Sequence, residues 1–240
     1  MDIGAEYERL IVPCHVCGRT NVVNRASDLG ETGFAIGREL LCQNPDCKGT
    51  VRVTFETANP DYQNMIWEAR RLRAEKRYML AVAALTQAFE MFFALGTEVM
   101  LVHHVANFAS ATDEQVTELI EELFKATRTH TYARMRNLFI SLALKNRPSS
   151  VAEARLFIRE AKTPPKELTD EAITMSTGEE LAKLLLRLNH LSIGTLRNRV
   201  IHKYAYRPTL PELNESLDQA TRLTGDLWVN LNLSTSLCGA

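Results

Sequence analysis

The sequence has little excess charge of either sign and no repeat. Across 240 residues, 28 lysines and arginines nearly balance 29 aspartates and glutamates, so the net charge is −1. A protein that coats nucleic acid without specificity needs a strongly basic surface, so this class is excluded. Any nucleic-acid role must rest on a local site. We find no low-complexity segment, and the hydrophobic share of 45% is that of an ordinary globular protein.

Long hydrophobic runs and an export signal are also missing. The most apolar stretch, 91–106, contains Glu98, His103 and His104, and no run approaches the roughly 20 apolar residues that span a bilayer. The N-terminus carries early acidic residues and lacks the basic and apolar regions of a signal peptide. We therefore expect a cytoplasmic protein with no membrane association.

Cysteine is scarce, but four of the five cysteines lie within the first 47 residues. They are Cys14, Cys17, Cys42 and Cys47, in the order C-x2-C, 24 intervening residues and C-x4-C. A short turn of this kind directs two thiolates at one ion, and the intervening loop brings in the second pair. The spacing predicts a structural Zn²⁺ site. Four thiolates leave no open position for catalysis, and disulfides are not expected in the cytoplasm.

Two residues near the chain ends are assigned no role in this site. His15 lies inside the first cysteine pair, but four thiolates already complete a closed site, so we expect His15 to be exposed. Cys238 stands alone near the C-terminus and is interpreted as an ordinary thiol on a tail.

The pattern of hydrophobic residues divides the chain into three parts. Residues 1–58 contain short β-branched and aromatic stretches at 10–12, 21–24, 34–41 and 50–56. Strands around two cysteine pairs predict a small β zinc ribbon. Residues 59–233 follow the helical period. We expect helices over 62–76 and 77–107, either continuous or separate, and a helix that ends near residue 127 after the cap-like tract 110–115. Further helices are expected over 131–145, 149–161, 178–204 and 210–230. The segment 162–176 is predicted to be a loop and 234–240 a tail. The fold class is therefore mainly α.

A second chemical pattern lies near the end of the predicted 178–204 helix. Asn198 and His202 are four residues apart and share a helix face. Arg197 is five residues from His202, about 140° around the helix, but its long side chain can curl back. Histidine exchanges protons near neutral pH, and arginine offers a fork of donors to a phosphate. The alternative is a basic helix end with a structural histidine.

These three residue types suit RNA transesterification without a metal ion. A base removes the ribose 2′-OH proton, an acid protonates the leaving 5′-oxygen, and a cation stabilises the charge on phosphorus. One histidine supplies half of the proton transfer, whereas two copies across a dimer supply all of it.

The segment Arg197-Asn198-x-x-x-His202-x-Tyr204 resembles the signature of the HEPN superfamily, in which a histidine follows an arginine and a polar residue. The tract 69–90 is similar to the early helix pair of that family, with a basic stretch before an aromatic residue, an Ala-Val pair and an Ala-x-Glu ending. Both similarities fall in the helical region and in the family's order.

The resemblance implies a HEPN-like helical bundle that forms a homodimer, with paired arginine and histidine motifs meeting at the interface to cleave RNA. It identifies Arg197, Asn198 and His202 as the catalytic set. In one toxin subgroup, a partner nucleotidyltransferase modifies a tyrosine two positions after the histidine, and Tyr204 occupies that position. The chain departs from those toxins in its size and its zinc ribbon. Glu90 matches an acid that sometimes supports the arginine, although a solvent-facing or core-edge acid is the preferred interpretation.

Basic residues around the motif are candidates for RNA binding or regulation. They are Arg199, Lys203 and Arg207, with Tyr204 as a tyrosine that stacks on a base or simply packs. Two other basic clusters, at 70–77 and at 134–136, are interpreted as solvated helix faces.

Three functions remain in competition at this stage. The first is a metal-independent endoribonuclease of a toxin–antitoxin or antiviral defence system, with an antitoxin or nucleotidyltransferase partner. The second is a catalytically inactive HEPN sensor or adaptor that binds nucleic acid or a protein. A zinc-ribbon transcription factor ranks last, because the ribbon carries few basic residues.

Overall fold

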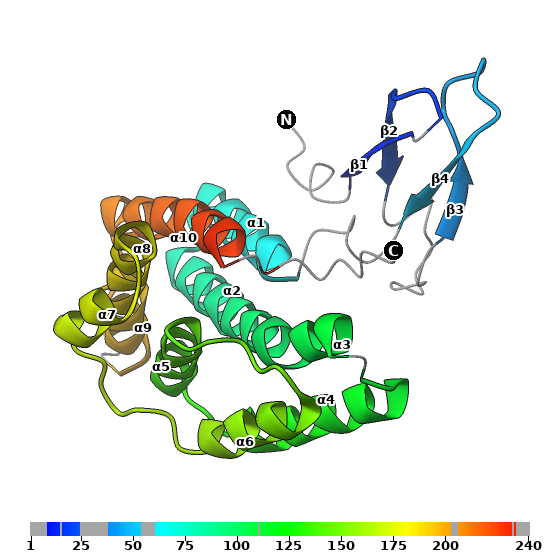
Figure 1. Cartoon of the computed structure of the whole chain (residues 1–240). Coiled ribbons are helices and arrows are strands. Elements are labelled where there is room, and N and C mark those ends of the chain that lie inside the picture. Colours follow the sequence, from blue (N-terminus) through cyan, green and yellow to red (C-terminus); the bar gives the residue numbers. More distant parts are fainter. Residues whose placement is uncertain are drawn as a thin grey trace.

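The computed structural model of the chain describes residues 9–14, 16–24, 38–53, 61–109, 111–202, 206–231 and 233. Most of these residues are helical, and four short strands precede the helices (Figure 1). The prediction of a mainly α protein is therefore confirmed.

Two antiparallel hairpins form the described N-terminal part. Strand β1 (Arg9–Pro13) pairs with β2 (Thr20–Asn24), and β3 (Arg38–Leu41) pairs with β4 (Thr50–Val53). The first cysteine pair lies in the loop of the first hairpin and the second pair in the loop of the second. The predicted strand residues at 34–37 and 54–56 lie outside the described part of the chain.

The rest of the described chain is helical. The elements in order are α1 (Asp61–Ala74), α2 (Tyr78–Glu98), a π-helical turn η3 (Val99–His103), α3 (His104–Phe108), α4 (Asp113–Thr127), α5 (Tyr132–Ala143), α6 (Val151–Ala161), α7 (Asp170–Ser176), α8 (Glu179–Asn189), α9 (Ser192–His202) and α10 (Leu210–Asn230). Side-chain caps explain several starts. Thr112 before α4 and Thr209 before α10 each form a capping box with the residue three positions later.

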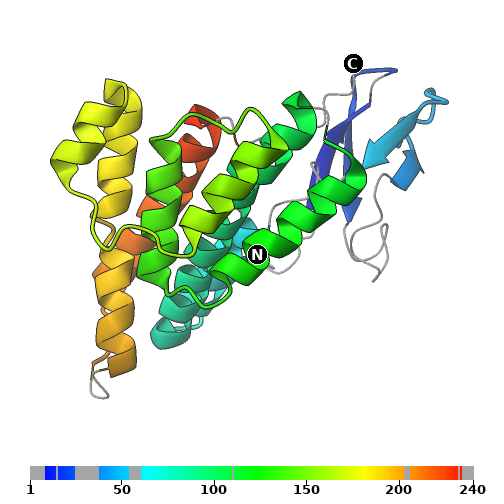
Figure 2. The same cartoon turned by 60° about the horizontal axis from the view of Figure 1, so that its bottom comes forward.

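Helix α2 is the centre of the helical bundle. It packs against α1, α5, α9 and α10, and its aromatic residues Phe89, Phe92 and Phe93 are buried. Phe93 lies 5.6 Å from Phe139 and 5.7 Å from Tyr132, measured between ring centroids. Burial on several sides explains why α2 is apolar around most of its surface. Figure 2 shows α8 and α9 at one edge of the bundle, beside α5.

The stretch Tyr78–Ala106 is long and apolar enough to cross a membrane by length and composition, with a mean hydropathy of 1.6. The expectation that no stretch reaches this length and hydropathy was wrong. The reason is the central position of α2: 56% of the apolar window is buried inside the protein. A core helix has to be apolar in the same way as a membrane span.

Helices α1 and α2 are separate, which is one of the two arrangements that the sequence allowed, and Lys76 between them adopts a φ of 60°. Two other regions differ from the predicted ones. The predicted loop 162–176 contains α7, which Thr169 caps by accepting a hydrogen bond from the Ala172 backbone N–H. The predicted 178–204 helix is two helices, α8 and α9, which His190 and Leu191 separate.

Gly96 gives a direct test of the packing between α2 and α5. A Cβ added to Gly96 would collide with the Phe139 ring, whereas a Cβ added to Gly225 in α10 meets nothing within 4 Å. We expect Gly96→Ala to lower the free energy of unfolding by about 1–3 kcal/mol. Gly225→Ala should raise it by about 0.5–1 kcal/mol, because alanine favours a helix. Urea denaturation followed by circular dichroism at 222 nm measures both, and equal stabilisation by both would contradict the packing.

Candidate functional site

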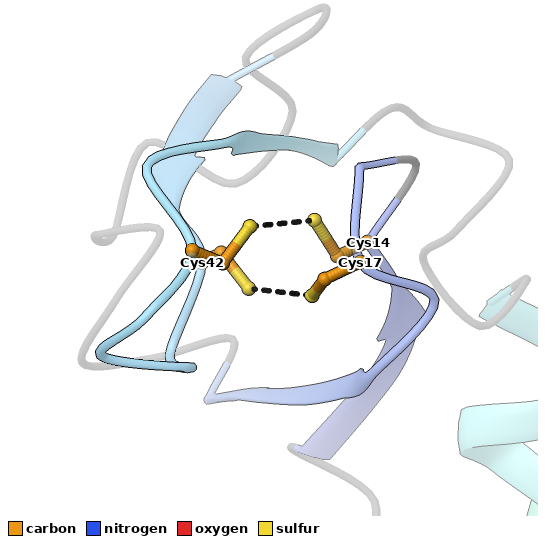
Figure 3. A group of neighbouring side chains, drawn as sticks. Cys14, Cys17 and Cys42 are labelled. Atoms are coloured by element: carbon orange, nitrogen blue, oxygen red, sulfur yellow. Dashed lines mark hydrogen bonds between the residues drawn. The ribbon is translucent and has the colours of Figure 1, made fainter.

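Two short turns bring the four N-terminal cysteines together. In the first, Gly18 donates its backbone N–H to the Cys14 carbonyl and adopts a φ of 69°, which favours glycine. In the second, Cys47 donates its backbone N–H to the Asn44 carbonyl at 2.9 Å. Figure 3 shows the labelled side chains of Cys14, Cys17 and Cys42 pointing toward one another.

Two residues join the turns to each other. Asn21 is buried, and its Oδ1 accepts a hydrogen bond from the Gln43 backbone N–H at 2.6 Å. Gly49 lies against Val16, since a Cβ built on Gly49 would come within 2.7 Å of the Val16 Cγ2. A side chain at position 49 would therefore separate the two turns. The sequence pattern did not reveal this contact.

The sulfur positions fit a tetrahedral metal site. All four Sγ atoms lie within 4.8 Å of one another, with 3.8 Å between Cys14 and Cys47 and 3.7 Å between Cys17 and Cys42. A disulfide needs about 2.05 Å between sulfurs, so these pairs are not bonded. Four thiolates at about 2.3 Å from one zinc ion stand about 3.8 Å apart. The prediction of a four-cysteine site is confirmed as a cluster that can hold a metal ion.

The electrostatics of the cluster also favour a bound cation. The Arg19 backbone N–H is the main cause that lowers the pKa of Cys17 to about 6. At Cys47 the Gly49 backbone N–H favours the thiolate, but burial and the neighbouring thiols outweigh it and raise the pKa of Cys47 to about 12. Thiols this close cannot all ionise without a positive charge between them. A metal ion supplies that charge.

The second candidate site lies on α9, which buried residues fix to the bundle. Ile193 and Leu196 are buried, and Val200 is partly buried against the same core. The side chain of the next residue, Ile201, lies outside the described part of the chain. Because α9 packs against α2, the side chain of Arg197 is held close to α2.

Arg197 stands at the junction of two cavities. Its Nη1 donates a hydrogen bond to the Asn198 Oδ1 at 3.3 Å. The smaller cavity, of about 190 Å³, is lined by Arg197 together with Glu90, Thr86 and Val200. The larger one, of about 550 Å³, is lined by Arg197 and Asn198 with residues of α5. The arginine therefore reaches space for a ligand on two sides.

The structure brings Glu90 to the same cavity as Arg197. Burial raises the pKa of Glu90, and the positive charge of Arg197 acts in the opposite direction. Glu90 is half-buried at the edge of the core, as the preferred interpretation held. Its support of Arg197, which the resemblance implied, stays a prediction that this placement favours.

The Arg199 side chain contacts Glu212 and Tyr206 of the same chain. Its Nη2 lies 2.9 Å from the Glu212 Oε1, and its guanidinium stacks 4.6 Å above the centre of the Tyr206 ring. Tyr206 donates its hydroxyl to the same Glu212 oxygen at 2.5 Å. The hydrogen bonds from Tyr206 and Thr209, with the charge of Arg199, lower the pKa of Glu212 to about 2. This cluster joins α9 to α10, and a contact of Arg199 with RNA stays a prediction.

Other predicted site residues are only partly described. His202 is the last residue of α9, but its side chain lies outside the described part of the chain, as do Lys203 and Tyr204. Arg207 is exposed and lies against the Met79 sulfur. His15 and Cys238 also fall outside the described residues.

The cluster of basic residues at 70–77 makes contacts within the chain. Arg70 donates to the Thr221 hydroxyl at 2.8 Å and lies above the Trp67 ring. Arg73 donates to the Asn214 Oδ1 at 3.0 Å. These contacts tie α1 to α10, and the interpretation of the cluster as a solvated helix face stays a prediction.

The sequence interpretation misplaced His190 and did not connect α5 with the motif. His190 falls inside the predicted 178–204 helix. It instead follows α8, contacts Asp170 and lines the same large cavity as Arg197. Arg136 and Tyr132 of α5 line that cavity too. The end of α8 at Asn189 was not predicted. It separates His190 from α9, the helix that carries Arg197 and Asn198.

Comparisons with known proteins leave this site without an assigned family. No family model matches the chain, no curated protein matches it, and no solved structure matches it.

Proposed function

We propose that the protein is a metal-independent endoribonuclease that uses Arg197, Asn198 and His202. The observation that carries the proposal is the position of Arg197, which Asn198 holds at 3.3 Å on the border of two cavities. An arginine in such a place can hold a phosphate with its remaining N–H donors. The resemblance of 197–204 to the HEPN signature supports the same assignment.

The proposed reaction is a transesterification within RNA. The ribose 2′-oxygen attacks phosphorus and loses its proton, and the bond from phosphorus to the 5′-oxygen breaks as that oxygen gains a proton. His202 exchanges one of these protons, and the His202 of a second protomer exchanges the other. Arg197 stabilises the added charge on the phosphate oxygens. The products carry a 2′,3′-cyclic phosphate and a 5′-hydroxyl. This division of labour requires a homodimer.

We propose that Cys14, Cys17, Cys42 and Cys47 hold a structural Zn²⁺. The sulfur distances fit that ion, and a complete thiolate set suits structure rather than catalysis. The zinc ribbon then serves as a recognition module for the target or a partner. The proposed setting is a cytoplasmic toxin or antiphage defence system.

The direct test is an RNA cleavage assay in EDTA. A mixture of single-stranded RNAs should be cut by the purified protein, whereas strands of the same sequences with 2′-deoxy sugars should remain intact, because the 2′-oxygen is the nucleophile. The zinc content of the protein is measured after the assay, so that loss of the ribbon metal is not mistaken for loss of a catalytic ion. Equal cutting of the 2′-deoxy strands would refute the mechanism.

Tyr204 provides a prediction about regulation. If a nucleotidyltransferase silences this protein, co-expression with that enzyme should add whole nucleotide masses to the peptide that contains Tyr204. The added phosphates would bring negative charge beside the motif and compete with RNA for the arginine. Mass spectrometry of wild type and Tyr204→Phe checks this. A modified Tyr204→Phe protein, or an unmodified wild type, would remove the role of Tyr204.

The same assay also tests the alternative function, a catalytically inactive sensor or adaptor. Specific RNA binding without cleavage, unchanged in His202→Ala, would replace the ribonuclease proposal by that function.

A further inference from the structure

The larger cavity at Arg197 has the dimensions and the walls of a ligand site. Its volume of about 550 Å³ lies within the range of roughly 300–1,000 Å³ for small-molecule pockets. It lies between α5, the end of α8 and the first turns of α9. We infer that this cavity binds one nucleotide of an RNA strand, with its phosphate on Arg136, His190 and Arg197. The inference rests on the proposed function and names its substrate subsite.

The charge of the walls favours an anion. Two guanidinium groups and the imidazole of His190 line the cavity, and among the described residues that line it none carries a carboxylate. The N-terminal part of α9 contributes Gly194 and Thr195 to the wall. A helix N-terminus carries a partial positive charge, which adds to that of the side chains.

Arg136 is held in position and keeps donors for a ligand. Its Nη1 donates to the Asn189 carbonyl at 3.0 Å, and its Nε and Nη2 donate to the Asn137 Oδ1. Asn137 is itself buried, and its Nδ2 donates to the carbonyls of Pro165 and Lys166. A guanidinium has five N–H donors and these bonds use three, so one N–H on each Nη remains. Such a fixed fork suits the two oxygens of a phosphate.

His190 is oriented by Asp170. The His190 Nε2 lies 2.9 Å and 2.8 Å from the two carboxylate oxygens of Asp170. The hydrogen bond from His190 is the main cause that lowers the pKa of Asp170. The carboxylate at this distance fixes the orientation of the imidazole and leaves its Nδ1 side for the ligand. The contact joins the start of α7 to the end of α8, so it also shapes the edge of the cavity.

Tyr132 supplies a second observation that points to a ligand. The residue is only 5% exposed, and its hydroxyl has no hydrogen-bond partner within the part of the chain that the structure describes. A buried hydroxyl without a partner is destabilising. Its ring lies against Gly194, where an added Cβ would come within 3.2 Å of the Cε1 atom. Tyr132 also lines the cavity, so a bound nucleotide would lie beside this residue.

The walls also explain why the ligand is a nucleotide rather than a bare phosphate. Ala133, Leu191 and Gly194 give the cavity an apolar side next to the charged one. A nucleotide presents the same combination, with a phosphate at one end and a flat, weakly polar base at the other.

The experiment measures binding of four probes by isothermal titration calorimetry: inorganic phosphate, uridine, uridine 3′-monophosphate and a short RNA analogue with 2′-fluoro sugars, which cannot be cleaved because it has no 2′-hydroxyl nucleophile. Two variants change the cavity. Arg136→Gln removes one guanidinium, and Thr195→Glu places a carboxylate in the wall. Thr195 is exposed and sits early in α9, where an acid does not weaken the helix. Arg134→Gln is the matched control, because Arg134 is two residues away on α5 and does not line the cavity.

We expect uridine 3′-monophosphate to bind at least tenfold more tightly than phosphate or uridine. Both cavity variants should weaken its binding and that of the oligonucleotide at least tenfold, while Arg134→Gln should change neither more than twofold. Circular dichroism shows whether Arg136→Gln folds, and Thr195→Glu tests the cavity independently of it. An unchanged affinity in Thr195→Glu would overturn the inference.

The probes distinguish RNA from a free nucleotide as the ligand, and the variants test the subsite separately from the proposed ribonuclease function. Tighter binding of the oligonucleotide than of the mononucleotide supports RNA, and the reverse order overturns RNA in favour of a free nucleotide. If RNA cleavage depends on His202 but the cavity variants leave nucleotide binding unchanged, the proposed subsite is wrong and the ribonuclease function is retained. If the cavity variants abolish binding but no RNA is ever cut, the function is wrong and the anion site stands.

Discussion

Replacing His202 with alanine is expected to lower the rate of RNA cleavage at least about 100-fold. A positioned acid or base contributes roughly 10²–10⁴ to a rate, and in a homodimer the substitution removes both histidines at once. Arg197→Ala should cause a loss of similar size, because it removes the cation that stabilises the charge on phosphorus. Arg197→Lys should recover only part of the rate, since lysine keeps the charge but loses the fork.

The controls for this prediction separate chemistry from folding. His103→Ala removes a partly exposed histidine of a different element, η3, where it pairs with Glu98 at 3.1 Å. This element packs on α2, α3, α4 and α6. It should cleave RNA like wild type. The helical circular dichroism signal of His202→Ala should also match wild type, because His202 is the last residue of α9. Wild-type cleavage by His202→Ala would refute the catalytic assignment.

The second large effect is expected at the cysteine cluster. The purified protein should carry one Zn²⁺ per chain, and Cys42→Ser should lose it, because three thiolates leave the tetrahedral site incomplete. Binding of a structural zinc contributes roughly 10–16 kcal/mol to small metal-dependent folds. The two hairpins should therefore lose their structure. Cys238→Ser is the matched control and should retain the metal.

Two measurements check the metal prediction. Elemental analysis gives zinc per chain, and alkylation with iodoacetamide counts the reactive thiols before and after denaturation with a chelator. We expect four protected thiols in the native protein and five reactive ones after denaturation. The helical signal of Cys42→Ser should remain, because the buried cluster around Cys14, Cys42 and Val51 is separate from the core of the helices. Two disulfides by mass, or no metal, would contradict the account.

Local sequence signals were enough for much of the fold. The cysteine spacing predicted the cluster that the structure contains, because two short turns place their thiols by local geometry alone. Capping residues also act locally, so a helix was expected after the tract 110–115, in which Thr112 is the cap. The Thr209 cap of α10 is a signal of the same kind that the prediction of the 210–230 helix did not use. The same kind of signal was present at Thr169, followed by two acids, and it was overlooked before α7.

Long-range contacts explain what the sequence did not reveal. No proline or glycine marks the break between α8 and α9. There Leu191 is buried, and Asn189 and His190 both contact Asp170, about twenty residues away. The candidate site was incomplete for the same reason. The sequence supplied Arg197 and Asn198, which are neighbours, but Arg136 and Tyr132 reach their cavity only through the packing of α5.

The central claim is the chemistry of Arg197, Asn198 and His202, and the chemical identity of the RNA ends tests it most directly. A single-stranded RNA is incubated with the protein in EDTA, and the products are analysed by mass spectrometry. We predict 2′,3′-cyclic phosphate and 5′-hydroxyl ends with wild type and none with His202→Ala. Products with 3′-hydroxyl ends, or identical products from both proteins, would contradict the account.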